Sequence, residues 1–406
     1  MRTVRRLQPF TSTIFAEISS LAAATGAVNL GQGFPDTDGP AGMLEAAKRA
    51  IDTGMNQYPP GDGLPELRRA VSAQVEREYD LHYDPDGEVL VTVGASEGIA
   101  AAVLGLVEPG QEVILIEPFY DSYAATVALA GAQRVVVPLV EADGRYRLDP
   151  AMLREAVTER TAAIIVNSPH NPTGTVLSDE DLQAIADLCV ERDLLCFTDE
   201  VYEYLLFDGR VHRPLAAFEG MWERTVRISG AAKAFNVTGW KVGWITAPRE
   251  LADACRAAKQ WLTFTGATPL QHAVAHALEN EASWLEKLAP DLQAKRDLLT
   301  TALRETGFTV HPSEGTYFVV ADARELGFDD AGALCREMPG RIGVAAVPVS
   351  ALADDQARWG HLLRFAFAKR DEVLTEGAQR LGRLRDGGQR NAGITSRSNS
   401  SSPEVS

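Results

Sequence analysis

The chain has 406 residues, of which 45% are hydrophobic and 23% are charged, and its formal net charge is −17. This length and apolar content predict a large lobe and a smaller one, each with a hydrophobic core. Nucleic acid and anionic membranes repel an acidic protein, so we expect neither as a partner.

The four cysteines are widely spaced, and none belongs to a C-x-x-C pair or a histidine-rich cluster. We therefore expect no metal site, and we expect buried thiols in a reducing cytoplasm. No window approaches the roughly 18 apolar residues of a membrane helix. Polar residues interrupt the basic N-terminus too early for a signal sequence.

The first 28 residues predict an extended arm followed by a helix over residues 14–25, where apolar side chains follow helical spacing. A glycine-rich turn comes next, and Gly33 in this turn allows the backbone to approach a ligand closely. A plain turn explains the same pattern equally well. Tyr58 lies in a segment too rich in Pro and Gly for a helix or a strand.

From residue 88 onward, short apolar runs alternate with amphipathic stretches. The apolar runs are residues 88–93, 112–116, 134–139, 162–166, 194–198, 224–228 and 241–246. The helical patterns include residues 99–107, 120–130 and 179–192. This alternation predicts an α/β fold with a mostly parallel sheet between helices, in which ligands bind at the carboxyl ends of the strands.

Candidate site residues follow several of these runs. They are Ala95 and Ser96 after the first run, Tyr120 after the second, Asn171 after the fourth, and Asp199 and Tyr202 after the fifth. The segment 94–96 opens a helix, where free N–H groups can bind a phosphate. Singly, each residue has a plainer explanation; Asp199, for example, is suited to capping the next helix.

After the sixth run, Lys233 lies among alanines and a phenylalanine, and Lys241 lies between two tryptophans. A lysine held out of water is a good nucleophile for Schiff-base chemistry, and a second cation suits a phosphate. If no other part of the sequence indicated a site, both would be read as ordinary surface lysines. Other parts of the sequence do indicate a site, because Asn171, Asp199, Tyr202 and Lys233 all follow predicted strands.

The C-terminal part predicts a long helix over residues 282–306 and strands at 315–320, 343–347 and 361–367. Arg364 interrupts the last apolar run, and a buried guanidinium requires a carboxylate partner. That partner is either an internal acid or a ligand. The predicted division is an arm and part of the small lobe at 1–45, a large lobe at 46–285, the rest of the small lobe at 286–386, and a disordered Ser-rich tail at 387–406.

These motifs together resemble the class I, fold type I aminotransferases that depend on pyridoxal 5′-phosphate (PLP). The resemblance extends over residues 10–385 and is strongest to the branch of kynurenine/glutamine transaminases and N-succinyldiaminopimelate aminotransferases. It implies a seven-stranded, mostly parallel sheet in the large domain and a smaller α+β domain. It also implies a homodimer with shared active sites.

The resemblance also implies roles for the residues already named. Lys233 forms a Schiff base with PLP, Asp199 pairs with the ring nitrogen, and Asn171 and Tyr202 hydrogen-bond the ring hydroxyl. Tyr120 stacks on the ring. The remaining implied roles are phosphate binding by Ala95, Ser96, Ser229, Lys241 and the neighbouring subunit's Tyr58, and substrate binding by Gly33, Asn171 and Arg364.

One position departs from the family pattern. The family usually has serine three residues before the lysine, where it contributes a hydroxyl to the phosphate. This chain has Gly230 at that position and Ser229 one place earlier. The expectation is that Ser229 and Ser96 compensate or that phosphate affinity falls.

The predicted activity is ping-pong transfer of an amino group between an L-amino acid and a 2-oxo acid. The candidate substrates are N-succinyldiaminopimelate and amino acids of the kynurenine, glutamine or methionine type, with Phe15, Phe34, Tyr123 and Gln271 shaping the side-chain pocket. One alternative is a PLP-dependent cysteine-S-conjugate β-lyase. A transcription regulator of the same fold is less suitable, because only about 28 residues precede the fold, too few for a DNA-binding domain.

Overall fold

The computed structural model describes residues 3–11 and 13–385, and its largest element is a seven-stranded sheet with the order β2-β10-β9-β8-β7-β3-β4. Every run predicted in this part of the sequence forms one of its strands. The strands are β2 (Val89–Val93), β3 (Glu112–Glu117), β4 (Gln133–Pro138), β7 (Thr161–Asn167), β8 (Leu195–Asp199), β9 (Thr225–Gly230) and β10 (Val242–Thr246). All neighbouring pairs are parallel except the two that β10 makes with β2 and β9.

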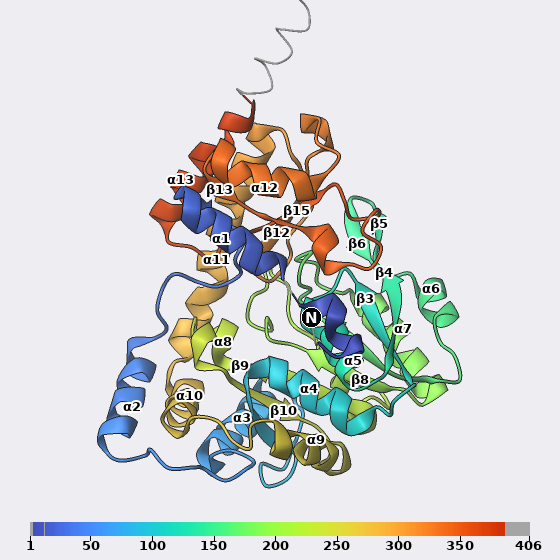
Figure 1. Cartoon of the computed structure of the whole chain (residues 1–406). Helices are drawn as coiled ribbons and strands as arrows, with labels where there is room; N and C mark the ends of the chain where they lie inside the picture. The colour runs from blue at the N-terminus through green and yellow to red at the C-terminus, as the bar shows by residue number, and fades with distance from the viewer. Residues whose placement is uncertain (1–2, 12, 386–406) are drawn as a thin grey trace, which may run out of the picture.

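The central strands of the sheet are buried on both faces, and most of their residues are apolar. In β3, Ile114 and Ile116 pack into one hydrophobic cluster, while Val113 and Leu115 pack into another on the opposite face. This alternation follows the two-residue period of a strand. The sheet is therefore the middle layer of a three-layer lobe (Figure 1).

Helices cover the two faces. One face is packed by α4 (Gly94–Leu106), α5 (Asp121–Leu129) and α9 (Arg249–Leu262). The other face is packed by α3 (Pro65–Tyr79), α7 (Asp179–Arg192) and α10 (Thr268–Asn280). Helix α7 begins with a capping box between Ser178 and Asp181, which satisfies two free N–H groups of the first turn.

The smaller lobe contains a four-stranded sheet with the order β11-β12-β15-β14. Its strands are β11 (Thr309–Val310), β12 (Phe318–Asp322), β14 (Val347–Pro348) and β15 (Leu362–Ala366). Its helices are α12 (Ala331–Arg341), α13 (Asp371–Leu381) and the long α11 (Ala282–Thr306), which connects the two lobes in Figure 1. The long predicted helix is thus confirmed.

The N-terminal segment joins the smaller lobe. Helix α1 (Ile14–Thr25) packs on α12, and β1 (Val28–Asn29) pairs with β13 (Val344–Ala345). Helix α2 (Ala41–Asp52) returns to the large lobe and packs on α10. The exact lobe boundaries at residues 45, 285 and 386 stay predictions, and the predicted tail at 387–406 lies outside the described residues.

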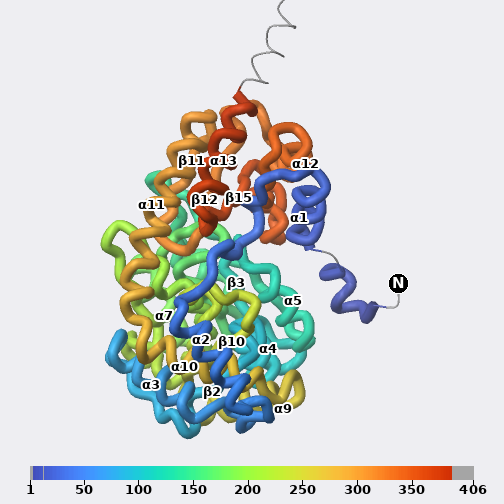
Figure 2. Tube along the Cα trace, turned by 90° about the vertical axis from the view of Figure 1, so that its left-hand side faces the viewer, coloured from blue at the N-terminus to red at the C-terminus, as the bar shows by residue number. Residues whose placement is uncertain are grey.

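Shorter elements complete the chain. They are the hairpin β5 (Val140–Ala142) and β6 (Arg145–Arg147), helices α6 (Pro150–Glu155) and α8 (Ala231–Ala234), and the 3-10 turns η1 (Arg5–Phe10), η2 (Leu215–Ala217), η3 (Trp222–Arg224), η4 (Thr238–Trp240), η5 (Arg324–Leu326) and η6 (Val349–Leu352). The predicted extended arm therefore contains a 3-10 turn. Figure 2 shows this turn, η1, projecting sideways beyond α1.

Two strand predictions for the smaller lobe were too simple. Residues 343–347 form no single strand, because β13 pairs with β1 while β14 pairs with β15 in another sheet. Residues 315–320 begin as a turn, in which Thr316 has φ of 66°, and β12 starts only at Phe318. In both places the chain changes direction within a run of apolar residues.

The four cysteines are buried and free, as the sequence predicted. Among the described residues, no helix combines the length and the apolar character needed to cross a membrane.

Candidate active site

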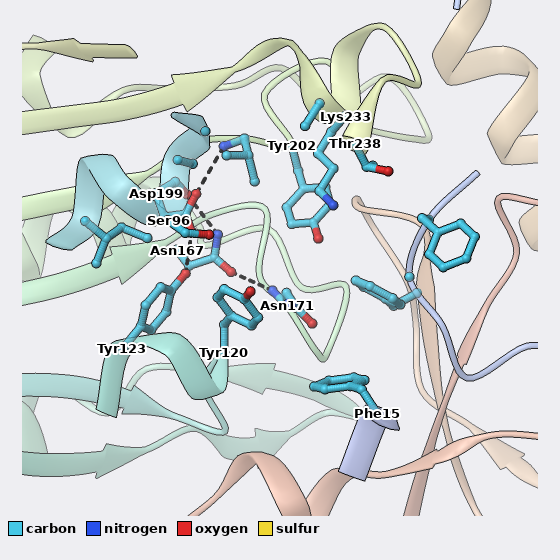
Figure 3. A pocket seen from close by; sticks show the side chains of 18 of the residues that line it. Phe15, Ser96, Tyr120, Tyr123, Asn167, Asn171, Asp199, Tyr202, Lys233 and Thr238 are labelled. Carbon is cyan, nitrogen blue, oxygen red and sulfur yellow. Dashed lines mark hydrogen bonds between the residues drawn. The ribbon is translucent and has the colours of Figure 1, made fainter. Parts of the chain in front are cut away.

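The ends of five strands meet at one edge of the large sheet and surround a cavity of about 330 Å³. Figure 3 shows how side chains from these ends point toward a common space. The predicted residues that line the cavity are Phe15, Gly33, Phe34, Ala95, Ser96, Tyr120, Tyr123, Asn171, Asp199, Tyr202, Lys233, Lys241 and Arg364. Because β10 runs against its neighbours, its amino end lies at this edge, which is how Lys241 reaches the site.

One end of the cavity is suited to a phosphate. Here the first turn of α4, at Gly94–Ser96, faces Lys241, and a β-carbon added to Gly94 would lie 3.2 Å from the lysine Nζ. A β-carbon at Gly243 would lie 2.6 Å from the carbonyl carbon of Gly94, so only glycine allows β10 to approach this turn. A helix N-terminus with an adjacent lysine favours an anion.

Ser229, which was predicted to bind the phosphate together with Ser96, lies away from this end of the cavity. Ser229 does not line it, and its hydroxyl is buried and donates instead to Glu203 Oε1. Strand alternation explains the difference, because Ser229 points to the opposite face of the sheet. Gly230 offers no room for the usual serine either, since a β-carbon there would lie 2.9 Å from the carbonyl oxygen of Val242.

Asp199 lies on the floor of the cavity, where it is 5% exposed. The Tyr123 hydroxyl donates to its Oδ2 at 2.6 Å, and the Val201 N–H donates to its Oδ1 at 3.4 Å. Burial raises the pKa of the Asp199 carboxyl, although the Tyr123 hydroxyl opposes the shift. Among the described residues, Asp199 forms no ion pair. A buried carboxylate in this position favours a cationic ligand group.

The side-chain amide of Asn167 holds the loop after β7 against Asp199. Asn167 Nδ2 donates to the Asp199 carbonyl oxygen at 2.8 Å, and its Oδ1 accepts from the Asn171 N–H at 2.7 Å. The Asn171 side chain is thereby directed into the cavity, as Figure 3 shows. Sequence analysis did not assign Asn167 to the site, although it ends an apolar strand like Asp199.

Lys233 extends into the cavity from α8. Its Nζ lies 5.8 Å from the ring centre of Tyr202 and 5.4 Å from that of Tyr317. The side chain is half-buried, because it points into the open cavity. The sequence predicted an amine held out of water, whereas in the single chain Lys233 is only partly buried.

At the other end of the cavity, Arg364 is 2% exposed. Its Nη1 donates to Asn171 Oδ1 at 2.9 Å and its Nη2 to the Gly31 carbonyl oxygen at 3.0 Å, while its Nε has no partner. The guanidinium lies 3.9 Å from the ring centre of Phe318. Burial lowers the pKa of Arg364 to about 10.

The internal-acid alternative for Arg364 is not supported, since it forms no ion pair within the described part of the chain. The carboxyl group that acts on the pKa of Arg364 is that of Asp121, which is not bonded to it and whose own pKa is raised by burial. A buried guanidinium with free donors in a cavity is suited to the carboxylate of a ligand.

Two further predicted residues lie away from this cavity. Tyr58 is 82% exposed and packs edge-on against Phe264. Gln271 is buried under the segment 63–64, where its Oε1 accepts from the Leu64 N–H at 2.9 Å. It therefore does not shape this chain's own side-chain pocket, contrary to expectation.

Sequence analysis also missed residues that line the cavity. Thr238 brings a hydroxyl to it from η4, within the segment between Lys233 and Lys241, and Gln32 and Phe318 complete its wall. The position of Thr238 inside the lysine segment was a usable signal. Phe318 had none, because it belongs to the smaller lobe and only packing brings it here.

Comparison with known proteins identifies the family. A model of the family described as aminotransferase class I and II matches residues 25–381. A protein of Mycobacterium tuberculosis named probable N-succinyldiaminopimelate aminotransferase is 58% identical over 388 residues, which are 93% of this chain and 98% of that protein. The chain belongs to the class I and II aminotransferases.

Two other similarities support this assignment. The kynurenine–oxoglutarate transaminase 3 of Mus musculus is 38% identical over 400 residues, covering 92% of this chain and 88% of that protein. A solved structure of N-succinyldiaminopimelate aminotransferase from Mycobacterium tuberculosis superposes with a TM-score of 0.93 at 57% identity, covering 94% of this chain and all of that one.

Membership settles the fold class and the type of reaction. The protein has the fold type I architecture, and it is an enzyme of the transaminase type. Aminotransferases of this family depend on PLP and act on small molecules.

Proposed function

We propose that this aminotransferase binds PLP in the cavity described above and transfers an amino group between an L-amino acid and a 2-oxo acid in two half-reactions. The observation that supports this most directly is the arrangement of charges. Lys233 lines the same cavity as the carboxylate of Asp199 and the guanidinium of Arg364, and neither of these two buried groups has an ion-pair partner among the described residues. This combination of groups suits a cofactor over Asp199 and an amino acid next to it.

The residues of the cavity fit PLP at each of its functional groups. The α4 turn with Ser96, together with Lys241 and Thr238, would hold the phosphate without Ser229. Asn171 and Tyr202 would hold the ring hydroxyl. Asp199 would hold a proton on the ring nitrogen, which compensates for the burial of its charge.

When bound, PLP supplies an aldehyde that accepts the amino group and a ring that withdraws electrons from the substrate's α-carbon. The Lys233 amine would attach to that aldehyde at rest and, once released, hold the proton that leaves the α-carbon. Arg364 would bind the α-carboxylate with its two terminal nitrogens. Tyr120 and Phe15 would exclude water from the reacting atoms.

For the amino donor, we propose N-succinyldiaminopimelate. A relative named as a probable aminotransferase of this compound is 58% identical along nearly the whole chain. A second candidate class, amino acids of the kynurenine or methionine type, is favoured by the walls of the cavity. Phe15, Phe34 and Phe318 line it, and the cations that line it in the described chain are Lys233, Lys241 and Arg364. All three have other roles, so a distal carboxylate has no dedicated cation.

We also propose a homodimer, because the surface around Tyr58 is unusually apolar. Trp261 is 85% exposed, Leu262 is 46% exposed and Phe264 is 39% exposed, and Phe264 contacts Tyr58. A second copy of the chain would cover this patch and would receive Tyr58 at its own phosphate site. The cytoplasm is the proposed location, since the four thiols are free.

Lys233→Ala should remove the visible absorption of the purified protein and its amino-transfer activity, because the attaching amine is lost. The thermal unfolding temperature should change little. Lys241→Gln is the matched control: it should bind PLP more weakly but keep an adduct that borohydride traps. A trapped adduct in Lys233→Ala would contradict the role of Lys233.

Arg364→Lys should raise the KM for the amino acid about 10- to 100-fold with a smaller effect on kcat, because a lysine keeps the charge but not the bidentate donors. Arg134→Lys is the matched control, since Arg134 makes a bidentate pair with Asp354 away from the cavity. An unchanged KM in Arg364→Lys would place the carboxylate elsewhere.

A rate screen tests the substrate. With 2-oxoglutarate as acceptor, N-succinyl-L,L-2,6-diaminopimelate should give a higher kcat/KM than kynurenine, methionine, glutamine and glutamate. A preference for kynurenine or methionine would instead support the second candidate class. Release of pyruvate and ammonia from cystathionine without any 2-oxo acid would support the β-lyase alternative and contradict transamination.

A subunit-mixing experiment tests the dimer. Lys233→Ala and Tyr58→Ala should each be impaired at limiting PLP, whereas their reassorted mixture should regain up to about a quarter of wild-type activity, because half of the dimers then have one intact site. A mixture no more active than its separate parts would contradict sharing of Tyr58.

A further inference from the structure

A second group of charged side chains lies behind the catalytic edge, on the opposite face of the sheet. Glu200 is 2% exposed, Glu203 is 5% exposed, Arg227 is 3% exposed and Ser229 is 4% exposed. Arg227 and Ser229 come from β9, and their neighbour Ile228 packs on the α4 face. The two side chains therefore point away from the cavity.

The group is closely hydrogen-bonded. Arg227 donates from Nε at 2.9 Å and from Nη2 at 2.6 Å to Glu200 Oε2, and His212 Nε2 lies 2.8 Å from the same oxygen. Thr198 donates to Glu200 Oε1 at 2.7 Å. Glu200, Glu203 and His212 also have the spacing of metal ligands, but Arg227 already supplies a cation to both carboxylates.

Within this group, Glu203 connects two segments that contribute to the reaction. Its Oε1 accepts from the Ser229 hydroxyl, and its Oε2 accepts from the Tyr79 hydroxyl at 2.6 Å. Glu203 directly follows Tyr202, and Ser229 lies four residues before Lys233. The Ser229 hydrogen bond thus joins the turn of Tyr202 to the strand that leads to Lys233.

The hydrogen bond between Ser229 and Glu203 lies just beyond the end of the backbone pairing between β8 and β9. The last pair of β8 with β9 is Asp199 with Ile228, after which the two chains diverge into a turn and into α8. The Glu200 N–H still donates to the Ile228 carbonyl oxygen at 2.8 Å. Beyond that bond, Glu203 contacts β9 at Ser229 and at Arg227, and Ser229 is the nearer of the two to Lys233 along the chain.

We propose that Ser229 is a positioning residue for amino transfer, which acts through Glu203 to hold Tyr202 in place relative to Lys233. This inference rests on the proposed function of Lys233 and Tyr202. It also assigns Ser229 a role different from phosphate binding. Without the hydroxyl, a buried carboxylate oxygen of Glu203 lacks a donor, so the side chain turns toward Arg227 and shifts the adjoining Tyr202.

The test compares Ser229→Ala with Thr225→Val in the PLP-bound enzyme. Thr225 is the matched control, because it is buried on the same face of β9 and donates its hydroxyl to the Met221 carbonyl oxygen at 2.6 Å, far from Lys233. The measurements are the thermal unfolding temperature, kcat, KM and the pH midpoint of the visible absorption change. The last one reports the surroundings of the Lys233 attachment.

Both variants should lower the unfolding temperature. Ser229→Ala alone should lower kcat about tenfold and displace the absorption midpoint by about half a pH unit, while the KM for the amino acid stays near the wild-type value. Ser229→Thr should restore both properties, because it keeps the hydroxyl. Ser229→Cys replaces Ser229→Ala if the alanine variant does not fold.

A double-mutant cycle with Glu203→Gln tests the route of the effect. If Ser229 acts through Glu203, the double variant should be no worse in kcat than Glu203→Gln alone. Additive losses would overturn this route, and a wild-type kcat and midpoint in Ser229→Ala would overturn the proposal itself. A wild-type protein that stays colourless with PLP would instead refute the proposed function, so the failures are distinguishable.

Discussion

The site depends on a topological constraint, which is that nearly all of its functional side chains come from strand ends at one edge of a sheet buried on both faces. The carboxyl ends of β2, β3, β7, β8 and β9 are where the chain leaves the sheet and presents polar groups to the cavity. The reversed strand β10 adds Lys241 at the same edge. A rigid, doubly covered sheet therefore sets the distances between the reacting groups.

The charges at this edge are arranged for a ligand with several charged groups. Lys241, Lys233 and Arg364 line the cavity together with the carboxylate of Asp199. Asp199 and Arg364 are both almost fully buried, and burial shifts their pKa values toward their neutral forms. Neither has an ion-pair partner in the part of the chain that the structure describes, and burying both in this way costs stability, which is consistent with a site organised for binding.

The smaller lobe completes the cavity. Arg364 on β15 and Phe318 on β12 approach the site from this lobe, and the Tyr317 hydroxyl donates to the Gly33 carbonyl oxygen at 2.5 Å. The phenylalanine-rich wall and the absence of a further lining cation in the described chain favour an apolar extension of the substrate. The relative from Mycobacterium tuberculosis is named for N-succinyldiaminopimelate, so the wall of the cavity and the similarity to that relative emphasise different properties of the proposed substrate.

The sequence by itself determined the strands of the large sheet, the order of the polar residues at their ends and the family. It could do so because apolar runs, turns and strand-end motifs are local patterns. Only the tertiary structure decided that Ser229 turns away from the cavity, that Gln271 lies outside it and that Phe318 lines it. These outcomes depend on which face of a strand a side chain occupies and on how the two lobes pack, and a one-residue change of register reverses the first of these.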